Sequence, residues 1–151
     1  MENRIILQDE FFTSLTRELL VLKEMVQCAE EQKQALTQFD SPRLDAVVQR
    51  QAELSETLRT LERRRISAIS TAFGVPFAQA SSISMSEIAT MVDDEQRQVL
   101  KALQTEFRRY TTSLQQLNSL NRLLTDRSKK FIQETMHILT NGGMPLYNVR
   151  I

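Results

Sequence analysis

The sequence predicts an all-α, elongated, coiled-coil-like protein in which three long helices and one short helix form an antiparallel hairpin or bundle. The first observation is a scarcity of turn-forming residues. The 151 residues include 3 Gly and 3 Pro, where average usage would give about ten and about eight. This scarcity excludes β-sandwiches and barrels, which need a turn every ~8–12 residues, and disfavours enzymes with glycine-rich phosphate loops. The second observation is that apolar residues recur in alternating short steps typical of helices packed along a narrow seam.

The first long helix is expected over residues 5–38. Its junction with the next helix is Phe39-Asp40-Ser41-Pro42, in which Asp40 or Ser41 can cap a helix and Pro42 suits a first helical turn. Lys33 interrupts the apolar seam of this helix. The apolar residues of the seam are Phe12, Leu15, Leu19, Leu22, Val26, Ala29 and Leu36.

The second long helix is expected over residues 42–73, because Gly74 and Pro76 prevent its continuation. Since almost no loop separates it from the first helix, residues 1–73 are predicted to form a long antiparallel αα-hairpin. The seam of the second helix includes polar positions and reads Leu44, Val47, Gln51, Leu54, Leu58, Leu61, Arg65 and Ala68.

Residues 74–93 are predicted to be a connector with one short helix, residues 85–92, because Ser84 and Glu87 form a capping-box pattern. Asp93 is placed to cap a third long helix over residues 94–140. At 1.5 Å per residue this helix spans roughly 70 Å, against about 45–50 Å for either earlier helix. It must therefore overhang the hairpin or be broken. Residues 141–151 follow as a tail, and the whole chain, 1–151, is expected to be one helical domain.

The residue types present favour binding over chemistry. His137 is the one histidine and Cys28 the one cysteine, whereas zinc and iron sites need several such ligands. We therefore expect a protein that is not an enzyme and holds no metal or cofactor.

A formal net charge of 0 gives no global attraction to nucleic acid or anionic membrane, and no apolar run is long enough for membrane insertion. The acidic Glu2 argues against a secretory signal, and a lone cysteine favours the reducing cytoplasm.

Two features leave a helix-turn-helix DNA-binding module as an alternative. Basic residues cluster at Arg59 and over residues 63–65, and residues 74–89 resemble the turn that precedes the small helix of such modules. The candidate recognition helix is acidic, however, with Glu87 and no Lys or Arg, whereas recognition helices are basic. A generic coiled-coil scaffold or dimeric adaptor is the stronger alternative. The protein itself is expected to be a monomer or a homodimer.

Asn121 is a polar residue on the seam of the third helix, and Asn118 precedes it by about one turn. A buried Asn at a seam position fixes the register between helices, whereas an amide on an open face would hydrogen-bond a partner. Both interpretations stay open, because the third helix is longer than the hairpin. Where the hairpin leaves it uncovered, this helix offers a groove to a partner helix. The apolar residues around Asn121 are Leu114, Leu117, Leu120, Leu123 and Leu124.

The segment around Asn121 resembles the Asn-x-x-Asn-x-x-Leu signature of the FlgN family of flagellar type III export chaperones. It reads Leu117-Asn118-Ser119-Leu120-Asn121-Arg122-Leu123-Leu124. The Glu-rich first helix, the junction from Phe39 to Leu44 and the basic end of the second helix, Leu61 to Arg65, are similar to that family's N-terminal hairpin. Tyr147 matches the family's tyrosine after the last long helix, although the glycines that follow it there are replaced here by Asn148-Val149-Arg150-Ile151.

The resemblance implies a cytoplasmic chaperone for the hook-filament junction proteins FlgK and FlgL, the flagellar hook-associated proteins. Members of the family bind the C-terminal segments of these clients, keep them unassembled and deliver them to the export gate protein FlhA. The resemblance assigns the export-gate contact to Tyr147. The substrate-binding residues are expected to be Leu114, Leu117, Asn118, Asn121, Leu124, Ser128 and Phe131.

Overall fold

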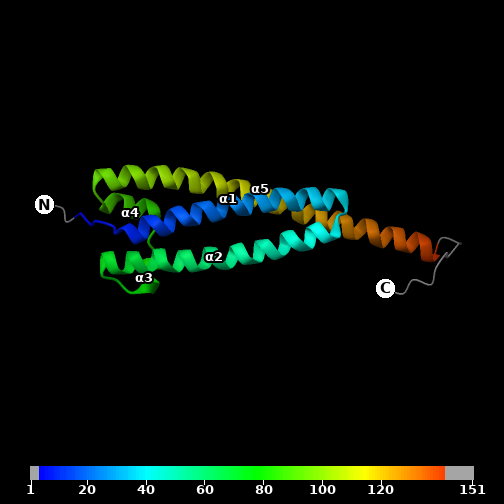
Figure 1. The fold of residues 1–151 in the computed structure, drawn as a ribbon, viewed down its shortest axis with the longest axis horizontal. Helices are drawn as coiled ribbons and strands as arrows, with labels where there is room; N and C mark the ends of the chain where they lie inside the picture. The colour runs from blue at the N-terminus through cyan, green and yellow to red at the C-terminus, as the bar shows by residue number, and fades with distance from the viewer. Residues whose placement is uncertain (1–3, 142–151) are drawn as a thin grey trace.

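The computed structural model describes residues 4–141, and the regular structure within them is helical apart from one isolated β-bridge between Ile5 and Val92. The predicted all-α class is confirmed. Figure 1 shows an elongated molecule in which three long helices lie side by side and two short helices cluster at one end. Only one short helix was expected there, so α3 is an addition. The helices are α1 (Asp9–Gln38), α2 (Ser41–Phe73), α3 (Phe77–Ser81), α4 (Met85–Met91) and α5 (Asp94–Asn141).

Helix ends lie where the sequence places capping residues. A carboxylate oxygen of Asp40 accepts a backbone N–H one turn into α2, and Gly74 ends α2 in the left-handed conformation with φ of 64°. Ser84 and Glu87 form the expected capping box of α4. A carboxylate oxygen of Asp93 accepts a backbone N–H at 2.8 Å at the start of α5. Local hydrogen bonding of this kind satisfies backbone donors that a helix end leaves free.

The segment before α1 is extended, and α1 begins at Asp9 rather than near residue 5. The side-chain amide of Gln96 accepts the N–H of Leu7 at 3.0 Å and donates to the carbonyl of Leu7 at 2.9 Å. The N–H of Ile5 donates to the carbonyl of Met91 at 2.8 Å. These bonds tie the beginning of α1 to the beginning of α5, so both helices start at the same end of the molecule.

The helix pair α1–α2 runs antiparallel. Glu18 on α1 lies against Arg65 on α2, and further along the pair Gln32 lies against Gln51. Both contacts use polar seam positions of α2.

The pair α1–α5 runs parallel. Ala29 lies against Asn121, and Phe39, just after α1, lies against Phe131. The Cα atoms of α2 and α5 stay more than 8 Å apart over the whole of both helices. Consequently α1 is the central helix, with α2 on one side and α5 on another.

The core is concentrated at the end where all five helices meet. Its buried residues are Leu7, Phe11, Leu15, Ile66, Ile69, Ala80, Ile88, Ala89, Val92 and Leu100. A second buried cluster joins α1 to α2 further along and draws none of its members from α5: Val21, Cys28, Val47, Leu54 and Leu61. The far half of α5 is therefore held along one side only, by α1.

The third long helix is continuous and overhangs the hairpin. The 30 residues of α1 span about 45 Å, and the 48 residues of α5 span about 72 Å. Because the two helices start together and run parallel, α5 continues well past the hairpin tip, as its orange end shows in Figure 1. None of the described helices combines the length and the apolar character that crossing a membrane requires.

Candidate protein-binding face

Asn121 is buried against α1 and joins a network of amides that spans the three long helices. Its side chain is 2% exposed, and its Nδ2 donates to the backbone carbonyl of Ala29 at 2.9 Å and to Oε1 of Gln32 at 3.3 Å. The same Oε1 of Gln32 accepts from Nε2 of Gln51 at 2.8 Å. Oδ1 of Asn121 is also buried, and no described residue donates to it. A buried amide that can donate at one place along a neighbouring helix fixes register, which is the first of the two interpretations left open above.

Most of the other expected site residues share the side of α5 that carries Asn121. Leu114 and Leu117 precede it and Leu124 and Ser128 follow it at helical spacing. All four are half-buried, so in this structure they form the seam with α1. Asn118 is exposed on a different side of the helix. Phe131 is 59% exposed at the hairpin tip. Tyr147 lies outside the described residues.

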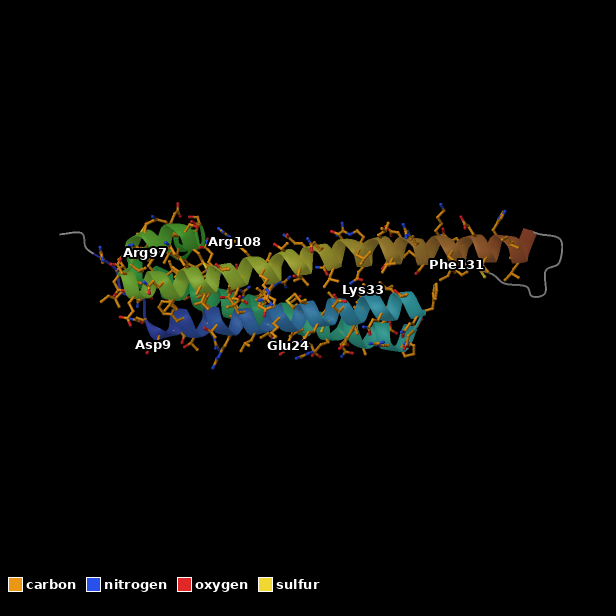
Figure 2. All side chains as sticks on the ribbon, turned by 90° about the horizontal axis from the view of Figure 1, so that it is seen from above. Asp9, Glu24, Lys33, Arg97, Arg108 and Phe131 are labelled. Atoms are coloured by element: carbon orange, nitrogen blue, oxygen red, sulfur yellow. The ribbon has the colours of Figure 1, made fainter. Side chains whose placement is uncertain are left out.

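The seam of α5 continues beyond the end of α1 and becomes a free surface. Ile132 and Leu139 come about three and five whole turns after Asn121, so they project in the direction that α1 occupies earlier. They are exposed because α1 has already ended at Gln38. Figure 2 shows Phe131 at this point, with α5 running on past the hairpin. We define the distal face as the exposed apolar residues of the hairpin tip and of α5 from residue 120 onward: Phe39, Leu120, Leu123, Phe131, Ile132, Ile138 and Leu139.

Phe39 extends the distal face from α5 onto the hairpin tip. Its ring lies 6.0 Å from the ring of Phe131, between centroids, and is 62% exposed. Its backbone is left-handed, with φ of 54°, at the position after a helix where glycine is usual. That conformation costs a residue with a side chain roughly 1–2 kcal/mol. The sequence predicted a helix end near Phe39 and no binding role for its ring. The sequence feature that could have indicated a binding role is a large apolar residue directly after a helix, at the position where glycine is usual.

Positive charge borders the distal face. Arg122, Arg127, Lys129 and Lys130 make no ion pair within residues 4–141, and the nearby acidic residues are Asp126 and Glu134. Exposed cations around an apolar strip favour a partner segment that is apolar on one side and acidic at its margins.

The one cysteine has the properties of a packed side chain. Burial raises the pKa of the Cys28 thiol, and the carboxylates of Glu31 and Glu24 raise it further, against an opposing effect of Arg50. A thiol with a raised pKa carries little of the nucleophilic thiolate. Among the residues that the structure describes, no group of three or more His, Cys, Asp or Glu side chains is arranged to hold a metal ion.

The fold and the distal face define a class of protein: an elongated all-α protein in which α5, the last of the described helices, carries exposed apolar residues past the hairpin tip. A family model described as FlgN protein matches residues 1–150. The chain therefore belongs to the FlgN family, and this membership indicates a flagellar export chaperone. A comparison with curated proteins found no match, and neither did a comparison with solved structures.

Proposed function

We propose that this protein is a cytoplasmic export chaperone, without enzymatic activity, that binds the C-terminal segments of FlgK and FlgL through the distal face. It keeps these clients unassembled and delivers them to the export gate protein FlhA. Family membership supports the class. One structural observation supports the site: α5 passes the hairpin tip with Phe131 and Ile132 more than half exposed.

Burial of apolar surface provides the binding energy in this proposal. Fully burying a side chain of the size of Leu, Ile or Phe contributes about 1.5–3 kcal/mol. An amphipathic client helix would lay its apolar stripe along the distal face at helical spacing. A client segment that becomes ordered on binding loses conformational entropy, which lowers affinity per unit area and suits later release.

The seam residues have a supporting role in this proposal. Asn121, with the half-buried Leu114, Leu117, Leu124 and Ser128, holds α5 against α1 in a register that leaves the distal face uncovered. Asn118 and Phe131 are exposed and accessible to a client.

Titration of the full chain with the C-terminal segment of a FlgK protein tests client binding. Calorimetry is expected to show saturable 1:1 binding, and Ile132→Asp is expected to weaken it by at least about tenfold, which is about 1.4 kcal/mol. Gln115→Asp places the same charge on an exposed position of α5 nearer its beginning and serves as the matched control. If Ile132→Asp binds like the wild type, the distal face is the wrong site. If the wild type itself fails to bind, the proposed function is wrong.

Delivery to the gate is tested at Tyr147. We expect Tyr147→Ala to lose binding to FlhA while binding the FlgK segment normally. Retained binding to FlhA would remove Tyr147 from the proposal and leave client binding untouched.

A further inference from the structure

A groove with an apolar floor lies between α1 and α2, and no residue of α5 lines it. All of its lining residues belong to α1 and α2, and its volume is about 560 Å³. Val21 and Leu61 are buried beneath it, and Leu20 stands beside it with 59% of its surface exposed.

Two unpaired arginines flank this groove. Arg17 on α1 and Arg64 on α2 line it from opposite sides, and neither side chain makes an ion pair or hydrogen bond within the described part of the chain. Arg63, also unpaired there, lines the adjoining groove next to Arg64. The carboxylate at this site, Glu56, is already held by Arg59 at 2.7 Å. The groove therefore combines an uncovered apolar floor with uncompensated positive charge.

The same α1–α2 surface is different nearer the hairpin tip. There Arg50 pairs with Glu24 at 2.8 Å and with Glu53 at 3.2 Å. Arg43 donates to the side chain of Gln34 at 2.8 Å. Cations at that end have partners within the chain, so the unpaired arginines are a property of the groove beside Leu20.

We propose that this groove docks an acidic amphipathic helix of a second partner protein, distinct from the client. A groove between two antiparallel helices suits a third helix, because ridges of side chains pack into such grooves. An apolar side chain of the partner would cover Leu20 and the floor residues Val21 and Leu61. Carboxylates on either side of it would pair with Arg17 and Arg64, since guanidinium groups bind carboxylates through two parallel hydrogen bonds.

The groove and the distal face are independent surfaces. No α5 residue lines the groove, and the distal face belongs to α5 and the hairpin tip. A client on the distal face leaves the groove accessible, so one molecule can hold both partners at once.

The test uses three fluorescent 16-residue peptides and the full chain. The probe peptide carries Leu on one helical face and Glu on its flanks. The second peptide has the same composition in scrambled order, and the third has Lys in place of Glu. Fluorescence anisotropy measures their affinities for the wild type, for Leu20→Ala, for Arg17→Glu/Arg64→Glu and for the control Lys101→Glu/Arg108→Glu. The control changes the net charge equally on exposed positions of α5, and circular dichroism monitors folding.

We expect the probe peptide to bind at least about tenfold more tightly than the other two peptides. Arg17→Glu/Arg64→Glu is expected to weaken probe binding at least about tenfold, Leu20→Ala several-fold, and the control by less than about twofold. Hydrogen exchange should then slow at residues 17–21 and 57–64. The proposal is overturned if the probe does not bind, if the scrambled peptide binds equally well, or if the control variant loses as much affinity. It is also overturned if the probe protects residues 120–139 instead, or if duplex DNA displaces it.

Discussion

Asn121 of α5 donates a hydrogen bond to the backbone carbonyl of Ala29 on α1, with Nδ2 and the oxygen 2.9 Å apart. The two residues are 92 positions apart in the sequence. Their contact sets the position of α5 along α1, and with it the length of α5 that passes the hairpin tip. The exposure of Ile132 and Leu139, past the hairpin tip, is therefore a consequence of this register.

Replacing Asn121 tests how much the buried side-chain amide lowers the free energy of unfolding. Asn121→Leu is expected to raise the free energy of unfolding by about 1 kcal/mol, because it removes a buried oxygen without a hydrogen-bond donor and adds an apolar side chain to an apolar seam. Urea denaturation measures the change. Asn118→Leu, at an exposed position, is the control and should stay within about 0.5 kcal/mol of the wild type. A loss of more than about 1 kcal/mol in Asn121→Leu would mean that the amide network is a net stabilising element.

Removing one partner of the ion pair between Glu18 and Arg65 should lower the free energy of unfolding strongly. Nε of Arg65 lies 2.7 Å from Oε2 of Glu18, and the Glu18 side chain is 3% exposed. Arg65→Met leaves that carboxylate buried without its cation and is expected to destabilise the protein by about 3–5 kcal/mol. Arg63→Met, at an exposed neighbouring position, is expected to change stability by about 0.5 kcal/mol or less. Similar unfolding midpoints for the two variants would contradict this account.

Glu18 should also make stability depend on pH. Burial raises its pKa above the usual 4.5, although the guanidinium of Arg65 lowers it. A carboxyl with a raised folded-state pKa contributes stability that is complete below about pH 4.5 and is lost as the pH rises through the folded-state pKa. Relative to wild type, Glu18→Gln should therefore gain in free energy of unfolding as the pH rises from about 4 to about 7. Urea denaturation across this range tests the sign, and a constant or opposite difference would contradict it.

Replacing Phe39 should weaken client binding without lowering the free energy of unfolding. Phe39→Gly relieves a left-handed backbone and loses a contact between two exposed rings, so stability should stay unchanged or rise by about 1 kcal/mol. Client binding should nevertheless weaken several-fold, because an apolar part of the distal face is removed. Phe77→Ala, which removes an exposed ring on α3, should leave client affinity unchanged. Normal client affinity in Phe39→Gly would restrict the site to α5.

The thiol of Cys28 should react slowly in the folded protein. Since its pKa is raised and the side chain is buried, little thiolate is available at neutral pH. We expect reaction with a disulfide reagent to be at least about tenfold slower in the native protein than in the protein unfolded in urea. Equal rates would show that the α1–α2 interface opens readily.

Helix ends could be predicted from the sequence because capping is local. Asp40, Gly74, Ser84 and Asp93 each act on backbone groups within a few residues. The five-residue helix α3 was missed because so short a segment has no measurable periodicity.

The covered and uncovered parts of α5 could not be separated from the sequence. Leu117 and Ile132 both lie on apolar stripes of one amphipathic helix, yet the first faces α1 and the second faces open space. The difference depends on the parallel alignment of α1 and α5, which Gln96 fixes through Leu7, 89 residues away. Contacts at such separation leave no periodic signal. For the same reason the sequence places Arg65 on the seam of α2 but does not identify Glu18, on α1, as its partner.

Hydrogen exchange of the full chain, with and without a saturating FlgK C-terminal segment, shows directly whether the distal face binds the client. We expect the client to slow exchange at residues 120–139 and around Phe39, while residues 17–21 and 57–64, around the groove between α1 and α2, exchange as before. Protection confined to α1 and α2, with residues 120–139 unchanged, would contradict the claim that the distal face binds the client.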